Sequence, residues 1–519
     1  MKCVRLGLIL FLIFQKAVES YKILTLLYLC NGSMRNLFDP ILLELAKKGN
    51  NVTVIASSPG TVKHENIQEL EGLDIKTMIK SLPNPDFIDM RLKHTPINVW
   101  YLRDKWTSDC DKFYNVPAVK NILNSNDKYD LIFLNSYMNE CTYGIAHHLN
   151  ASTIMISVFP VQPWAASVTA TPSPLSFVSH IYHVSSGSMR FGDRIMNIYQ
   201  YARNSFLKYF YYVPAIERVY QKYVPNAPGV SEIESNVSLV MGAGHFSFSP
   251  LRPIMTGIVD ELAGIHCRDP KPLPNEISRL IRKKGVDEDF IYFSFGSIVQ
   301  GHKLPPKYKQ AFISAFSKLN ISVLWKYEVD YEDVGTLPSN IHMLKWFPQQ
   351  DVLGHPKCKL FITHGGISSV TEALYHGVPI IGIPFFTDQD WNLKQAERIG
   401  VGVKLELEDV TEQVLDNLFH QFINEETYQK NADARSLLFR DRPLDVLSNA
   451  VWWVEHVLKH GGAEHLKSPA RKLNFIQYYS IDIAVFLVLS GGFLLLFCYM
   501  LLRFGIQAVC TIVTKKSKG

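Results

Sequence analysis

Residues 346–392 read WFPQQDVLGHPKCKLFITHGGISSVTEALYHGVPIIGIPFFTDQDWN. In this stretch an apolar strand, LFIT, runs directly into His364, Gly365 and Gly366, and a helical pattern follows. A second apolar strand, PIIGIP, ends just before Asp388 and Gln389. Strands that alternate with helical patterns indicate a parallel α/β sheet, and such sheets bind ligands beyond the carboxyl ends of their strands.

The turn after the first of these strands has the composition of a phosphate site. A helix that starts after a Gly-Gly turn offers free backbone N–H groups and the positive end of its dipole to an anion. Gly365 and Gly366 let the backbone approach a ligand closely. His364 can donate to a phosphate oxygen, and Ser368 and Ser369 add hydroxyl donors in the first helical turn.

Other residues of the stretch match the rest of a nucleotide-sugar ligand. Glu372 lies one helical turn further on, where a carboxylate can accept ribose hydroxyls. Trp346 offers a flat face to a base, and Asp388 and Gln389 can read hydroxyl groups. Each residue alone has a structural explanation, as a core aromatic, a solvated helix residue or a helix cap. Their joint arrangement is what favours a single bound ligand.

The same alternation of strands and helices extends over most of the chain. Apolar strands are predicted at 22–29, 51–56, 130–134 and 154–158 in the first half, and at 290–295, 322–327 and 342–346 in the second. A passage rich in Pro and charge, HCRDPKPLPNE at 266–276, indicates a linker between the halves. The fold class predicted is α/β, with two Rossmann-like domains that face each other across a cleft.

The stretch resembles the signature of the UDP-glycosyltransferase family, the membrane-bound animal enzymes that include UDP-glucuronosyltransferases and insect relatives. The match runs from WFPQQDVLGHP through FITHGG to DQDWN, and IYFSFGS at 291–297 agrees with it. The resemblance implies the GT-B arrangement of two domains. It also implies inverting transfer of a hexose, glucose or glucuronic acid, from a UDP-sugar to small lipophilic acceptors. UDP-sugar is then a co-substrate, and neither a cofactor nor a metal ion is expected.

The resemblance also assigns roles within the predicted site. Trp346 is expected to stack on uracil, Gln349 to lie near uracil and ribose, and Glu372 to bind ribose. The residues expected at the diphosphate are Ser297, His364, Gly366 and Ser368, with Gly365 and Ser369 in the same turn. Asp388 and Gln389 are expected to bind hydroxyl groups of the donor sugar.

The catalytic base of the family has no counterpart in this sequence. The family uses a His after the first strand, oriented by an Asp after a later strand, and counting back from Gly49 leads to Met34 or Arg35. Methionine has no proton site, and arginine stays protonated. Asn135 stands where several relatives have Asp, and the nearest acid is Glu140. Three explanations stay open: Glu140 is the base, the acceptor needs no base, or the protein binds UDP-sugar without turnover.

The alternatives to an active transferase differ in what they predict. A catalytically weak relative would bind UDP-sugar and partner an active paralogue, which leaves homo- and hetero-oligomers open. A nucleotide-dependent oxidoreductase is disfavoured because no G-x-G-x-x-G follows the first strand. Nucleic acid is not expected as a partner, since the net charge is only +5 and no basic run is interleaved with aromatics.

The two ends of the 519-residue chain indicate membrane targeting. Residues 1–20 have the charged start, short apolar core and small-residue end of a signal peptide. Residues 483–502 are apolar enough to span a bilayer, and basic residues follow them. This predicts a single-pass type I protein of the endoplasmic reticulum membrane with a lumenal body. Five sequons, at Asn31, Asn51, Asn150, Asn236 and Asn320, are compatible with that location.

These observations divide the chain into seven parts. They are a signal peptide (1–20), an acceptor-binding domain (21–265), the linker (266–276), a UDP-sugar-binding domain (277–451), helices that pack back on the first domain (452–480), a transmembrane helix (481–503) and a cytosolic basic tail (504–519). Five cysteines fall in the predicted lumenal body, so at least one is expected to be unpaired. Aromatic residues between 160 and 215 have three open explanations: an acceptor site, core, or contact with the bilayer.

Overall fold

The computed structural model describes residues 20–82, 86–94, 102–183, 188–283, 285–330 and 335–517. The chain forms two compact units, Met1–Lys467 and Ser468–Gly519, which are described separately. The predicted signal peptide lies outside the described residues except for Ser20.

The first sheet has seven parallel strands in the order β3-β2-β1-β4-β5-β6-β7. Every residue of β4 is buried, which agrees with a parallel sheet covered on both faces. The strands are β1 (Lys22–Leu27), β2 (Asn51–Ala56), β3 (Ile67–Glu71), β4 (Leu131–Asn135), β5 (Ser152–Ser157), β6 (Leu239–Gly242) and β7 (Ile258–Val259).

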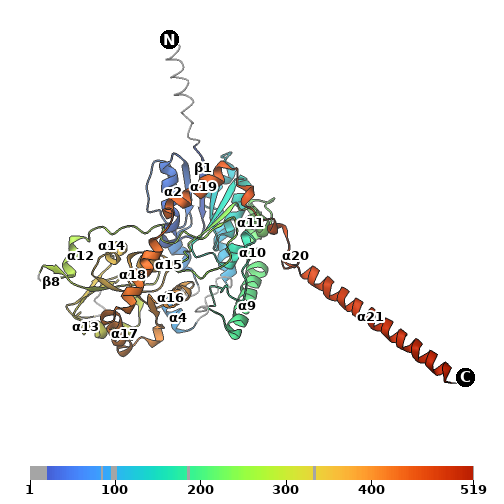
Figure 1. The fold of residues 1–519 in the computed structure, drawn as a ribbon. Helices are drawn as coiled ribbons and strands as arrows, with labels where there is room; N and C mark the ends of the chain where they lie inside the picture. The colour runs from blue at the N-terminus through green and yellow to red at the C-terminus, as the bar shows by residue number, and fades with distance from the viewer. Residues whose placement is uncertain are drawn as a thin grey trace, which may run out of the picture. The chain divides into compact units, whose positions relative to one another are not determined.

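The second sheet has six parallel strands in the order β12-β11-β10-β13-β14-β15. Its strands are β10 (Phe290–Ser294), β11 (Ser322–Lys326), β12 (Ile341–Leu344), β13 (Cys358–Thr363), β14 (Ile380–Gly382) and β15 (Gly402–Lys404). In each sheet the strand order reverses beside the first strand, between β1 and β4 and between β10 and β13. Such reversal points are the binding positions of doubly wound sheets. The predicted pair of Rossmann-like domains is therefore confirmed (Figure 1).

Helices alternate with the strands in both halves (Figure 1). Those of the first half are α2 (Gly32–Lys47), α3 (Ile75–Lys80), α4 (Phe87–Leu92), α5 (Arg103–Tyr114), α6 (Pro117–Asn124), α7 (Tyr143–Leu149), α8 (Pro163–Val168), α9 (Phe191–Phe206), α10 (Val213–Tyr223) and α11 (Val230–Ser235). Those of the second half are α12 (Asn275–Leu280), α13 (Pro306–Ser317), α14 (Gln349–Leu353), α15 (Ile367–His376), α16 (Gln389–Arg398), α17 (Glu412–Asn424), α18 (Glu426–Arg440) and α19 (Val446–Lys459).

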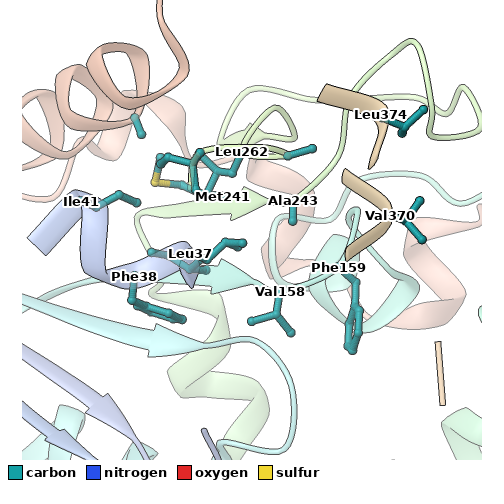
Figure 2. Packing of buried hydrophobic residues seen from close by; sticks show 14 of the residues in the cluster. Leu37, Phe38, Ile41, Val158, Phe159, Met241, Ala243, Leu262, Val370 and Leu374 are labelled. Carbon is teal, nitrogen blue, oxygen red and sulfur yellow. The ribbon is translucent and has the colours of Figure 1, made fainter. Parts of the chain in front are cut away.

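The hydrophobic core is continuous between the two sheets. Figure 2 shows Ala243 and Leu262 of the first half together with Val370 and Leu374 of α15 in one buried cluster. Burial of an apolar side chain of this size stabilises a fold by about 1.5–3 kcal/mol. The two halves are therefore held together by core packing as well as by the chain that links them.

Helix α4 departs from the predicted domain boundary. It comes from the first half of the chain, yet Ile88 is buried in the hydrophobic cluster of the second sheet. Phe87 stacks on Phe386 with ring centroids 4.2 Å apart. Arg91 donates to both carboxylate oxygens of Asp390 at 2.9 and 3.0 Å. A helix of six residues has no periodic signal long enough to reveal such a partner from sequence.

Helix α19 returns to the first half of the chain. It packs against α2 and β5, and Lys48 of the first half donates to Glu455 of α19 at 2.7 Å. Residues 452–459, the start of the segment expected to pack back on the first half, belong to this helix.

The second unit contains α20 (Phe475–Tyr478) and the long helix α21 (Ile481–Lys516). Within the described residues, Ile481–Thr514 is the one helix long and apolar enough to cross a membrane. The helix continues past residue 503, through most of the segment predicted as a basic tail.

A disulfide joins Cys110 of α5 to Cys141, which lies in the 3-10 turn Glu140–Thr142 after β4. Cys30, Cys267 and Cys358 are unpaired, as expected for at least one cysteine of the body. The cross-link closes a loop of 31 residues, for which a stabilisation of about 3 kcal/mol is typical. We expect the double variant Cys110→Ser/Cys141→Ser to unfold at lower urea concentration than the parent chain. Cys267→Ser is the matched control, and equal midpoints for all three would contradict the prediction.

Candidate functional site

A cavity of about 550 Å³ lies between the two sheets. Its walls are the segments that follow the carboxyl ends of β1, β4 and β5 on one side and of β10 to β14 on the other. Ten of the predicted site residues line it: Ser297, Trp346, Gln349, His364, Gly366, Ser368, Ser369, Glu372, Asp388 and Gln389. Residues from several strand ends thus meet in one place.

The turn at 364–366 depends on its two glycines. Gly365 has φ +83°, and a Cβ there would lie 2.5 Å from the side chain of Leu393. A Cβ on Gly366 would lie 2.7 Å from Nε2 of the His364 ring. Gly366 is the N-cap of α15, and no side chain caps this helix. The first turn of α15 therefore presents backbone N–H groups at the cavity, where an anion is favoured.

His364 acts in this site as a neutral ring. Burial, with a smaller contribution from Lys326, lowers its pKa from the ordinary 6.5 to about 4. At neutral pH it can therefore donate one N–H to a ligand but adds no positive charge.

The cavity also contains a cation that sequence reasoning missed. Lys326 ends β11, lines the cavity, and its ammonium group donates to the carbonyl of Gly296 in the turn that carries Ser297. Lysine is a common partner of phosphate because it supplies a full charge. The only signal in the sequence was a basic residue at the end of the predicted strand 322–327.

Glu372 is held at the cavity wall by two neighbours. Its Oε2 accepts a hydrogen bond from Gln349 Nε2 at 2.6 Å, and its Oε1 lies 3.2 Å from Nε2 of His266. Gln349 Nε2 also donates to Ser369 Oγ at 3.1 Å. The carboxylate is thereby fixed in direction, with lone pairs left for a ligand. His266 comes from the predicted linker, where no pattern in the sequence pointed to the site.

Trp346 stands at the edge of the cavity with 67% of its surface exposed, whereas the next residue, Phe347, is buried in the core. An exposed indole beside a cavity is suited to stacking on a planar ring. This arrangement is compatible with the predicted base platform.

Asp388 and Gln389 lie at the start of α16 and are mostly buried. Asp388 accepts hydrogen bonds from Asn392 at 2.5 Å and from Thr387 at 2.9 Å, and burial raises its pKa. Gln389 Oε1 accepts from the backbone N–H groups of Phe385 and Phe386. Both side chains therefore also shape the turn that holds them against the cavity.

The structure does not bring Glu140 to this cavity. Its carboxylate is buried and pairs with Lys208 Nζ at 3.2 Å, and Tyr212 donates to it at 3.4 Å. Arg35 is likewise withdrawn, because its guanidinium is buried and paired with Asp39 and Glu69. Glu140 as a base does not fit this position, and Arg35, one of the two positions reached by counting back from Gly49, is held in ion pairs away from the cavity.

On the first-sheet side, the described lining residues include no Asp, Glu, His, Lys or Arg. The titratable groups are Cys30, whose pKa burial raises to about 12, and Tyr137, whose pKa burial raises well above its ordinary value. Met34 is part of this wall. The lining residues are Leu29, Cys30, Asn31, Gly32, Ser33, Met34, Asn36, Leu37, Ile75, Ile79, Leu82, Phe87, Leu102, Trp106, Tyr137, Met138, Val158 and Phe159.

Comparison with known proteins agrees with this geometry. The family model described as UDP-glucoronosyl and UDP-glucosyl transferase matches residues 26–518. The chain belongs to the UDP-glycosyltransferase family. It is 32% identical over 486 residues to UDP-glucosyltransferase 2 of Dactylopius coccus, which covers 93% of each chain. It is 29% identical to UDP-glucuronosyltransferase 2A2 of Mus musculus, over 86% of this chain and 87% of that one.

Solved glycosyltransferases share the fold of this UDP-glycosyltransferase. The calicheamicin glycosyltransferase CalG4 has a TM-score of 0.56 and 15% identity, covering 85% of this chain and 99% of that one. The kitacinnamycin glycotransferase has a TM-score of 0.55 and 14% identity, over 84% and 98%. The GT-B architecture is therefore confirmed, while roles of single residues stay predictions.

The buried histidines of the body predict a pH dependence of stability. Burial lowers the pKa of His180 and His376 to about 4 and of His245 to about 3, as it does for His364. The unfolded chain binds these protons below about pH 6.5, whereas the folded chain does not. Stability is therefore complete above about pH 6.5 and is lost as the pH falls toward 4. We expect a lower melting temperature at pH 5 than at pH 7.5, and a shallower dependence for His245→Gln. A flat melting profile between these values would contradict this.

Proposed function

We propose that this UDP-glycosyltransferase transfers a hexose, glucose or glucuronic acid, from its UDP-sugar to small lipophilic acceptors. The observation that carries the proposal is the two-sided cavity. Its second-sheet wall holds the uncapped helix α15, Lys326, Glu372 and Trp346, and its first-sheet wall is mainly apolar. A charged donor would bind at the second-sheet wall, and an apolar acceptor would bind at the first-sheet wall.

In the proposed reaction the acceptor oxygen attacks the anomeric carbon while the bond from that carbon to the diphosphate breaks. UDP leaves with the bonding electrons, and the configuration at the anomeric carbon is inverted. The N-terminus of α15 and the ammonium group of Lys326 would stabilise the negative charge that develops on the leaving diphosphate. Trp346, Gln349 and Glu372 would hold uridine in place, and Asp388 and Gln389 the sugar, so that the acceptor lies in line.

The first-sheet wall adds a condition on the acceptor. The described residues of that wall include no side chain able to take a proton at neutral pH, and we propose that the acceptor reaches its nucleophilic form without a base from this wall. We propose acidic phenols, and amines whose lone pair is free, as the acceptor classes. Aliphatic alcohols, which keep their proton at neutral pH, are expected to be poor acceptors.

The experiment that tests the proposal measures UDP release from UDP-glucose and UDP-glucuronic acid in the presence of each acceptor class. We expect release with one donor and with nitrophenol-type acceptors, and little with aliphatic alcohols. Absence of release with every donor and acceptor would refute transfer.

A second candidate function is suggested by the same lack of a base. The chain would then bind UDP-sugar without turnover and act beside an active relative. This second function predicts that calorimetry detects heat of UDP binding, that the chain alone releases no UDP, and that the chain co-purifies with that relative. Binding together with turnover by the isolated chain would exclude it.

We also propose that α21 anchors the protein as a single-pass type I protein of the endoplasmic reticulum, with its body in the lumen. The apolar segment Ile481–Thr514 supports an anchor. The disulfide Cys110–Cys141 supports an oxidising compartment. Asn31 is an expected exception among the sequons, because its side chain accepts from Met34 N at 2.9 Å at the start of α2, beside the cavity.

A further inference from the structure

The turn that carries Asp388 and Gln389 has a strained backbone. It connects β14 to α16, and Thr387 within it has φ +54°. Residues with a branched Cβ are disfavoured in this left-handed region, and such a conformation persists only where surrounding contacts hold it. The contacts of this turn therefore decide where the side chains of Asp388 and Gln389 lie.

Open space borders the same turn. Phe386 and Thr387 line the cavity between the two sheets, and both also line a second cavity of about 490 Å³. Close-packed neighbours resist displacement of a segment, and a cavity removes part of that resistance. Hydrogen bonds of Gln389 and Asn392 fix the shape of the turn internally. Its position relative to the first half of the chain depends on contacts from outside.

Helix α4 supplies those contacts on both flanks of the turn. The Phe87 ring stacks on Phe386, with the ring planes 20° apart. The guanidinium of Arg91 donates to both carboxylate oxygens of Asp390. Phe87 and Arg91 are four residues apart, so they lie on one face of the helix. This single helical face thus contacts the chain both before and after residues 388–389.

The ion pair of Arg91 belongs to a network of four charges. Asp390 also pairs with Lys404 Nζ at 2.6 Å, and Lys404 pairs with Glu406 at 2.8 Å. Glu406 accepts a further hydrogen bond from Arg91, the member of the network that comes from the first half. The side chains of Arg91 and Asp390 are each 24% exposed, so water and salt screen their attraction less than that of a surface pair. The two-pronged contact of arginine with a carboxylate also fixes its direction.

The same helix reaches the first-sheet wall of the main cavity. Phe87 lines that cavity together with Ile75 and Ile79 of α3. The helix that holds the turn is therefore in contact with the surface proposed for the acceptor. An ion pair that only joined distant parts of the chain could lie outside the cavity lining, as the pair of Lys48 with Glu455 does.

We propose that Phe87 and Arg91 position the donor sugar by clamping this turn, and that they do so while the acceptor lies against the same helix. The inference rests on the proposed function, in which Asp388 and Gln389 bind sugar hydroxyls. Arg91 acts through Asp390 and is thus a positioning residue. In that function uridine and the diphosphate are held by residues of other elements, among them α14, α15 and β11. Loss of the clamp should therefore weaken binding of a UDP-sugar and spare binding of UDP.

The test compares ligands on the full chain by calorimetry, with UDP, UDP-glucose and UDP-glucuronic acid and without acceptor. In Arg91→Ala we expect the affinity for UDP to be unchanged. The affinity for the UDP-sugar that the parent chain binds should fall by about 10-fold, the loss expected when one charge-assisted hydrogen bond to the sugar is misplaced. Equal losses for UDP and UDP-sugar, or no loss for either, would overturn the clamp.

Further variants separate positioning from general loss of structure. Arg91→Lys keeps the charge but not the two-pronged contact, so the affinity for UDP-sugar should recover in part. Lys48→Ala, which removes the ion pair with Glu455, is the matched control and should change neither affinity. If Arg91→Ala does not fold, Phe87→Leu, which removes the aromatic stacking from the other flank, is judged by the same ratio of affinities.

The parent chain separates failure of the clamp from failure of the proposed function. A parent chain that binds UDP but neither UDP-sugar would refute the proposed function and the clamp with it. A parent chain that binds both kinds of ligand, beside an Arg91→Ala variant with the same two affinities, would refute the clamp alone.

Discussion

Replacing Glu372 with Gln should weaken UDP binding by roughly 10- to 100-fold, because charge-assisted hydrogen bonds contribute about 1.5–3 kcal/mol each. The carboxylate lies at the cavity wall and is oriented by Gln349 and His266. An amide of the same shape keeps one oxygen but loses the charge, and it turns a donor group toward one of its neighbours. Calorimetric titration with UDP measures the change, and Glu426→Gln on the exposed surface of α18 is the matched control.

The ligand itself can distinguish ribose recognition from a general disturbance of the site. If Glu372 binds ribose hydroxyls, the parent chain should prefer UDP to 2′-deoxy-UDP, and the Glu372→Gln variant should lose that preference. Equal losses for both nucleotides would assign Glu372 a structural role only.

His266 should act through Glu372 and not through the ligand directly. We expect His266→Ala to reduce UDP affinity less than Glu372→Gln does, and the double variant to be no weaker than Glu372→Gln alone. Such non-additivity is the signature of residues that share one network. His266→Asn, which keeps a polar side chain beside the carboxylate, should restore part of the affinity, and additive losses would contradict a positioning role.

The grouping of residues on the second-sheet wall could be predicted from sequence because its parts are local. A strand, a glycine turn and a helix bring His364, Ser368 and Glu372 together, and the relative positions of Ser368 and Glu372, about one helical turn apart, follow from helix geometry. The same holds for Asp388 at the end of the next strand. Lys326 and His266 join the site through the strand order and the path of the linker, which no local pattern encodes.

The first-sheet wall depends on tertiary contacts that the sequence did not reveal. Glu140 follows a strand end, as a ligand-facing acid would, but the buried ammonium group of Lys208 lies 68 positions later and turns it away from the cavity. Similarly, the sequence left three explanations open for the apolar residues of α9, and the hydrogen bonds of buried Asn197 decide which face of the helix points inward. Helix periodicity shows that residues share a face but not which way the face points.

Replacing Met34 with His should supply a base that the described residues of the first-sheet wall do not include. Met34 lines the cavity at the start of α2, and general-base catalysis typically accelerates a reaction by about 10²–10⁴-fold. We expect turnover of aliphatic alcohols to rise by at least about 10-fold, which is below the usual range. The gain is small because Asn135 is hydrogen-bonded to the backbone of Tyr137 and cannot orient the new ring as a carboxylate would. Steady-state rates with a matched alcohol and phenol measure the effect.

Two controls make the outcome interpretable. Met34→Gln has similar size but takes no proton near neutral pH, so it should leave alcohols unreactive. Arg35→His would remove a buried ion pair with Asp39 and should mainly destabilise the protein.

The pH profile of the rate distinguishes a base from a change in packing. With Met34→His the rate with alcohols should rise as the pH passes about 6.5, where the ordinary imidazole loses its proton. Phenols should gain little, because they already supply their own anion. If Met34→His and Met34→Gln behave alike with both acceptors, deprotonation is not what limits this chain, and the acceptor condition drawn from the first-sheet wall fails while the donor site stands.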